Sequence, residues 1–287
     1  MIGVIGGTGN TGRAVVAALK AKGADFRCLV RDLGKAAETL GSDVELVQAD
    51  TADAATIEAG LAGCDKLFLL TGHSPAMGEQ QTNAIAAAKR AGVKHIVKLS
   101  GGDAIVQENI SAKIGRAHWE IEQAMKASGL EWTILRPGFF MQNFLNMAGM
   151  VKGQGKVMMP VPADVQIGMI DVRDTGDVAA EVLTGDGHNG KTYFLAGPNQ
   201  TPSDFTAALS KELGTEIPFV QVPMEGAVGA MKERGMPDWL IDHQSKLMTL
   251  LGEGKMAGTS DYIEQLTGHA PRTLAGFAHD FAGAFRD

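Results

Sequence analysis

Short apolar runs alternate with longer amphipathic stretches through the first 140 residues of the chain. The runs are rich in Val, Ile and Leu and carry apolar side chains on both faces, which is typical of strands in a parallel sheet covered by helices on both sides. They cover residues 2–5, 26–30, 44–47, 67–70, 95–99 and 132–135.

The stretches between these runs have the spacing of amphipathic helices, notably residues 11–22, 54–61, 78–91 and 112–128. Gly92 and Gly129 follow the last two, at the position where a chain leaving a helix often turns left-handed. Strand, helix and strand in this order predict right-handed βαβ units, and hence an α/β fold with a Rossmann-like, doubly wound parallel sheet. Ligands of such sheets bind at the carboxyl ends of the strands. Those ends carry Gly6, Arg31, Asp50, Thr71, Ser100 and Pro137.

The rhythm becomes irregular after about residue 140. We expect short strands near 157–159, 193–196 and 217–222, and a segment, 166–184, that passes from strand to helix. Thr201 and Pro202 form a helix start, with Thr as N-cap and Pro in the first turn, and Gly214 is its stop. Residues 141–287 are therefore expected to form a smaller C-terminal α/β lobe across a cleft from residues 1–140, whose sheet is completed by segments near 166–200.

A glycine-rich loop lies directly after the first predicted strand and directly before a helix. Its glycines suit a tight turn, a close approach of backbone to a pyrophosphate, and close packing of helix against strand. The helix N-terminal amides would then face the phosphates. The alternative is a plain strand-to-helix connection in some other α/β protein. The dinucleotide contacts predicted in this loop are Gly6, Thr8, Gly9, Asn10, Thr11 and Gly12.

The residue after the second strand bears on the choice of cofactor. NAD sites carry an acidic residue there, whereas this chain has Arg31, with Lys35 four residues on. A guanidinium suits a ribose 2′-phosphate, so NADP(H) is favoured over NAD(H). Asp32 is the complication, because it could still accept from a ribose hydroxyl. Asp50 could accept from the adenine amino group or cap a helix.

Composition excludes some partners. Lysine and arginine number 26 against 33 acidic residues, a formal charge of −7, and no basic run is present, so no nucleic acid is expected. No apolar stretch approaches a membrane span and the start of the chain lacks a signal pattern, so we expect a cytoplasmic protein without a membrane partner. Cys28 and Cys64 lie in or beside apolar runs, as small buried thiols do. No metal site is predicted, and a homo-oligomer stays open.

Several segments together resemble the NmrA-like atypical short-chain dehydrogenases/reductases, a family that includes NADPH-dependent quinone reductases and triphenylmethane-dye reductases. The resemblance spans nearly the whole chain. It implies a Rossmann-like domain with a small C-terminal lobe, and a nicotinamide cofactor that runs from the glycine loop across Thr71 and Ser100 to Pro137. The segments that carry it are residues 6–12, 91–97, 99–100, 128–130, 133–137, 140–144 and 170–174.

Ordinary members of the wider superfamily use a Tyr-x-x-x-Lys pair, but neither Tyr193 nor Tyr262 has lysine at the fourth place. The resemblance puts His118 where quinone-reductase-like members have histidine and isoflavone-reductase-like ones have lysine. The helical spacing independently places His118 on or beside the apolar stripe, with Glu122 one turn later as a partner. It is a candidate proton donor or substrate contact, or else a satisfied histidine at the edge of the core.

Apolar residues after the sixth strand suit a flat substrate at the mouth of the cleft, although Phe and Met at helical spacing are often core. The predicted contacts are Phe139, Phe140 and Asn143. Residues 1–140 are thus assigned to NADP(H) and residues 141–287 mainly to substrate. The predicted function is NADPH-dependent hydride transfer to a small conjugated acceptor such as a quinone or dye. The alternative is a non-catalytic NADP(H) sensor that regulates a protein partner; sugar epimerisation fits poorly without the tyrosine–lysine pair.

Overall fold

The computed structural model describes residues 1–286, and its centre is a sheet of seven parallel strands. The strand order is β10-β6-β5-β4-β1-β2-β3. All six predicted strands are present with small shifts at their ends, and β10 adds the seventh beside β6. The strands are β1 (Ile2–Ile5), β2 (Phe26–Val30), β3 (Glu45–Gln48), β4 (Lys66–Leu69), β5 (His95–Leu99), β6 (Glu131–Pro137) and β10 (Lys191–Leu195).

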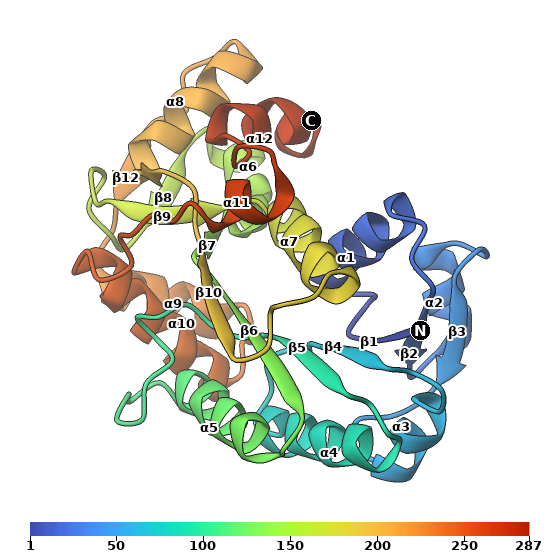
Figure 1. The fold of residues 1–287 in the computed structure, drawn as a ribbon. Coiled ribbons are helices and arrows are strands. Elements are labelled where there is room, and N and C mark those ends of the chain that lie inside the picture. Colours follow the sequence, from blue (N-terminus) through green and yellow to red (C-terminus); the bar gives the residue numbers. More distant parts are fainter. Residues whose placement is uncertain (287) are drawn as a thin grey trace.

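Helices cover both faces of this sheet (Figure 1). One face carries α1 (Asn10–Ala21) and α7 (Val172–Thr184), and the other carries α3 (Ala54–Gly60), α4 (Met77–Arg90) and α5 (Lys113–Ala127). A separate apolar core fills each side, because the strands are apolar on both faces. The Rossmann-like, doubly wound prediction is confirmed.

Two local features follow from short-range chemistry. Gly92 and Gly129 have φ angles of +83° and +81° and end α4 and α5 as predicted. A helix that the hydrophobic pattern did not indicate, α2 (Leu33–Leu40), begins where the Asp32 side chain accepts a hydrogen bond from the Lys35 amide. That N-cap is the reason the chain turns helical directly after β2.

The strand order also fixes where a ligand can enter. β1 lies between β2 and β4, so the connections leave it in opposite directions on its two sides. This is a topological switch point, and the loops at the carboxyl ends of the strands part there. The glycine loop after β1 lies at that opening.

The remainder of the chain forms a smaller lobe around a third apolar core. Phe144 and Phe205 stack inside it with ring centroids 3.8 Å apart. Residues 167–170 pair with β7 and β11 in a small sheet, so within the interval 166–200 only β10 extends the main sheet. The elements of this lobe are β7 (Phe139–Phe140), η1 (Met141–Met147), α6 (Ala148–Gln154), β8 (Val157–Met159), β9 (Ile167–Ile170), β11 (Asn199–Gln200), α8 (Pro202–Leu213), β12 (Phe219–Gln221), α12 (Leu274–Phe281) and η2 (Ala282–Phe285).

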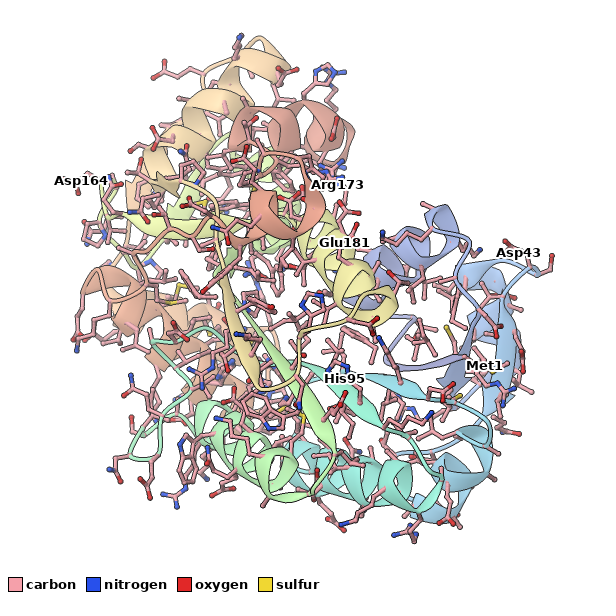
Figure 2. The ribbon with its side chains drawn as sticks, in the orientation of Figure 1. Met1, Asp43, His95, Asp164, Arg173 and Glu181 are labelled. Carbon is pink, nitrogen blue, oxygen red and sulfur yellow. The ribbon has the colours of Figure 1, made fainter. Side chains whose placement is uncertain are left out.

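Three further helices follow: α9 (Met224–Glu233), which packs on α10, α10 (Asp238–Gly252), and α11 (Tyr262–Thr267), which packs on α7 and β10. Helix α10 reaches the loop before α5, where Lys246 Nζ donates to the Ser111 carbonyl at 2.8 Å. Helix α7 joins the two regions: Figure 2 shows Arg173 at its end beside the lobe and Glu181 at its other end, near α1. Within residues 1–286, no helix combines the length and the apolar character needed to cross a membrane.

Candidate active site

Three of the four glycines in residues 6–12, after β1, have different structural reasons to be glycine. Gly6 has φ of +86°, and a Cβ there would lie 2.4 Å from the Leu70 carbonyl oxygen. A Cβ on Gly12 would lie 1.9 Å from the Gly6 carbonyl oxygen. A Cβ on Gly9 would meet only the Gly6 carbonyl oxygen, at an ordinary 3.6 Å. The protein itself thus has room for a side chain at Gly9, and a glycine there fits a ligand that approaches the backbone.

A cleft of about 730 Å³ opens above this loop. It runs from the end of β2 across the glycine loop to the segment that follows β4. Among the predicted contacts, Gly12 lies beneath the loop, and Asp50, Ser100 and Pro137 are not part of the lining. The predicted contacts that do line the cleft are Gly6, Thr8, Gly9, Asn10, Thr11, Arg31, Lys35 and Thr71.

The rim at the end of β2 carries unused positive charge. Arg31 is exposed, and no hydrogen bond or ion pair ties its guanidinium to another of the described residues. Asp32 is engaged instead, since its carboxylate accepts from the Lys35 amide at 3.0 Å and lies 3.8 Å from Lys35 Nζ. This arrangement fits a phosphate group better than a bare ribose diol.

Asp50 stabilises a turn rather than a helix. Its Oδ1 accepts from the Ala52 amide at 2.9 Å, while Asp53 caps α3. Its alternative role as a helix cap is therefore wrong, because α3 starts four residues later, at Ala54. A contact with adenine stays a prediction.

Three imidazoles meet at the other end of the cleft. The exposed His73 follows β4 and lines the cleft. Its ring centroid lies 5.8 Å from that of His118 on α5 and 5.1 Å from that of His243 on α10. Desolvation against these neighbours lowers the pKa of His73, and the charges of His243 and Lys98 act in the same direction. All three rings are therefore expected to be neutral near pH 7, because burial also lowers the pKa of His118 and His243.

A fully buried lysine lies behind the imidazoles. Lys98 on β5 donates from Nζ to Gln81 Oε1 at 2.8 Å and to the Leu99 carbonyl at 3.0 Å, and it lies 3.2 Å from His118 Nδ1. Gln81 in turn donates from Nε2 to Thr71 Oγ1 at 2.9 Å, which connects the lysine to the cleft wall. Burial lowers the pKa of Lys98 to about 7, against the opposing effect of Glu122.

The predicted pairing of His118 with Glu122 is wrong. Glu122 instead accepts from Ser100 Oγ at 2.6 Å and from two nitrogens of Arg136, at 3.1 and 2.5 Å. A permanently charged guanidinium holds a buried carboxylate more strongly than a neutral imidazole does. The Ser100 hydroxyl is thereby directed at Glu122 and is no part of the cleft lining.

The predicted substrate contacts lie away from this cleft. Phe139 is 3% exposed and packs edge-on against Phe144 in the core of the lobe, with ring centroids 5.6 Å apart. This placement fits the core alternative for Phe139. Phe140 and Asn143 are partly buried, and their contact with a substrate stays a prediction.

Sequence reasoning missed His73, Gln81, Lys98 and His243. Lys98 had a readable signal, because a charged residue inside an apolar run of a central strand has to find a buried partner. The others had none, since a loop, α4 and α10 bring them together from distant parts of the chain. The assembled cleft can hold an anionic group at one end and donate or relay a proton at the other.

Comparison with known proteins agrees with this geometry. An NAD(P)H azoreductase of Xenophilus azovorans is 37% identical over 286 residues, covering 99% of both chains. Quinone oxidoreductase 2 of Escherichia coli is 30% identical over 281 residues, 96% of both chains. The solved structure of that NADPH-dependent quinone oxidoreductase complexed with NADPH matches with a TM-score of 0.87 over 98% of this chain and 99% of the other, at 29% identity. The model of the NmrA-like family matches residues 1–275, and this chain belongs to that family.

Proposed function

We propose that the protein is an NADPH-dependent reductase of small conjugated acceptors such as quinones or azo dyes. Support comes from the relatives named as an azoreductase and a quinone oxidoreductase, both similar over nearly their whole length. The observation that carries the proposal is the continuity of the cleft, which joins the glycine loop and Arg31 to His73 without a break.

The residues at the end of the cleft beside β2 and the glycine loop fit NADP(H). The α1 N-terminus and the open space above Gly9 suit a pyrophosphate. The unpaired Arg31 guanidinium and the exposed Lys35 suit a 2′-phosphate. When bound, NADPH supplies the hydride for the reaction.

The residues at the other end of the cleft, where the three imidazoles meet, suit the acceptor. His118 is 4% exposed, and its neutral ring can hydrogen-bond the oxygen or nitrogen that becomes protonated on reduction. His243 joins this cluster from α10 and is its one member from residues 141–287 among the described residues, so the assignment of residues 141–287 mainly to substrate stays a prediction. The fully buried Lys98 and the Glu122–Arg136 ion pair lie behind this end.

The direct test is steady-state consumption of NADPH by the purified protein with a panel of quinones, azo dyes, triphenylmethane dyes and enones. We expect turnover with at least one class and tighter binding of NADPH than of NADH. Tight binding of NADPH with no turnover across the panel would instead indicate a non-catalytic NADP(H) sensor.

A further inference from the structure

The hydrogen bonds around Lys98 define the protonation pattern of its neighbours. Two of its three nearest polar atoms are carbonyl oxygens, Gln81 Oε1 and the Leu99 carbonyl, which only accept. The third is His118 Nδ1, at 3.2 Å. An ammonium has three N–H bonds and satisfies all three acceptors at once, so the charged form of Lys98 requires His118 Nδ1 to be unprotonated.

The proton of the neutral His118 ring then resides on Nε2. Lys98 is the one hydrogen-bond partner of the ring within residues 1–286. Nε2 makes no hydrogen bond to the described residues, yet it is not one of the fully enclosed atoms without a partner. Part of its surface is therefore accessible to solvent. The ring lies edge-on to His73 of the cleft lining, with ring centroids 5.8 Å apart, and Nε2–H is the donor of the ring that no described residue uses.

A neutral imidazole cannot act as an acid on its own. Burial lowers the pKa of His118 well below its ordinary value, and the charge of Lys98 lowers it further, so the ring carries no extra proton to give near pH 7. A proton lost from Nε2 has to be replaced at Nδ1 in the same event. The atom positioned to replace it is Lys98 Nζ.

We propose that Lys98 is a positioning residue and proton reservoir that acts through His118, so that a buried lysine supplies the proton for acceptor reduction. The inference rests on the proposed function. Bound NADPH would supply a hydride to one atom of the acceptor. The His118 Nε2–H bond breaks as an O–H or N–H bond forms on the acceptor, and a Lys98 N–H bond breaks as His118 Nδ1–H forms. Lys98 ends as a neutral amine and His118 ends as the other tautomer.

The surrounding charges fit such a reservoir. His118 and Glu122 face Lys98 from α5, Gln81 from α4 and His73 from the loop after β4. Glu122 raises the pKa of Lys98 while burial lowers it, which leaves the value at about 7. His243 on α10 and Arg136 on β6 act on His118 rather than on Lys98, and both keep its ring neutral. Between turnovers, the relay runs in reverse: a proton from solvent at the cleft binds His118 Nε2, and Nδ1 returns its proton to Lys98.

Two acceptors of different proton demand test the relay. An azo dye gains a hydride on one nitrogen and a proton on the other, whereas a cationic triarylmethane dye becomes neutral on gaining a hydride alone. In Lys98→Met, single-turnover oxidation of NADPH by the azo dye should slow by about 10²- to 10⁴-fold, the usual range of general acid catalysis. Reduction of the cationic dye should stay within about twofold of wild type, because no proton is required.

Lys66→Met is the matched control. Lys66 lies on the neighbouring strand β4, and its Nζ donates to the Gly185 carbonyl at 2.7 Å, away from the cleft. It should leave both reactions unchanged. Equal slowing of both dyes in Lys98→Met, or no slowing of either, would overturn the relay. In wild type, the azo rate should fall as pH rises through about 7, where Lys98 loses its proton, and the cationic-dye rate should not.

The tautomer of His118 provides a test without turnover. In ¹⁵N-histidine NMR of the wild-type protein at pH 6, with the resonance assigned by its loss in His118→Gln, we expect the proton on Nε2. A proton on Nδ1 would overturn the proposal even if Lys98→Met fails to fold. Failure of the proposed function is distinguishable, because wild type would then oxidise NADPH with neither dye while the NMR result still reports on the pairing.

Discussion

The two ends of the cleft are built in different ways. The phosphate end consists of backbone, in the glycine loop and the N-terminus of α1, together with the exposed side chain of Arg31. The reaction end consists of buried side chains from β5, α4 and α5, together with His243 from α10. One end is a local segment of the chain, and the other exists only after the chain has folded.

This difference has energetic consequences. The phosphate end buries no charge, so changes there should affect binding and leave the fold intact, except at Gly6 and Gly12, where an added Cβ would meet backbone atoms. The reaction end buries Lys98, Glu122 and part of Arg136, each of which is costly out of water unless its partners remain in place. Changes there should affect stability as well as chemistry.

Gly9→Val should have the largest effect. The branched side chain would occupy the space of the pyrophosphate, and NADPH affinity should fall at least about a thousandfold, or about 4 kcal/mol. The melting temperature should stay near wild type, because a Cβ at Gly9 meets no atom closer than 3.6 Å. Isothermal titration calorimetry measures the affinity, and thermal melting followed by circular dichroism measures the melting temperature. Gly149→Val, at a helical position with open space, is the control, and retained affinity in Gly9→Val would place the dinucleotide elsewhere.

Glu122→Gln, at the reaction end, should lower the stability of the folded protein. It leaves the Arg136 guanidinium without its buried counter-charge, although Asp103 remains at 2.9 Å. We expect about 3 kcal/mol of destabilisation, or roughly 5 to 10 °C in melting temperature. Glu120→Gln, which removes an exposed ion pair on the same helix, should cost less than about 1 kcal/mol. Equal melting of the two variants would show that the buried pair contributes nothing special.

Arg31→Ala should reduce the preference of the protein for NADPH over NADH. Loss of a charge-assisted phosphate contact worth about 1.5 to 3 kcal/mol should weaken NADPH by about ten- to a hundredfold and leave NADH unchanged. Arg234→Ala, at the exposed end of α9, is the control. Equal affinity of the wild-type protein for NADPH and NADH would remove the 2′-phosphate assignment of Arg31.

Lys35→Ala should have the smallest effect. The Lys35 side chain is 84% exposed, and such contacts contribute only about 0.2 to 1 kcal/mol. NADPH affinity measured in moderate salt should fall by no more than about fivefold. A loss of NADPH affinity as large as that in Arg31→Ala would show that both side chains contribute equally to binding the phosphate.

The same contrast explains what the sequence could predict. The sheet and the glycine loop were readable because strand periodicity, Gly6, Gly12 and the α1 start are all local properties. The partner of Glu122 could not be predicted in this way, because Arg136 comes from a different element, β6, and binds Glu122 in place of the helical neighbour His118. The position of residues 167–170 was also missed, since a short buried strand fits either sheet and tertiary packing decides.

The central claim is that both ends serve one reaction, and His118→Gln tests it most directly. Glutamine keeps a polar side chain of similar reach, while His118→Ala separately reports the cost of a cavity. In single-turnover NADPH oxidation with a saturating azo dye, we expect His118→Gln to bind NADPH like wild type and to react about 10²- to 10⁴-fold more slowly. Wild-type rates in both variants, with only the melting temperature reduced, would contradict the claim and leave His118 as a core histidine.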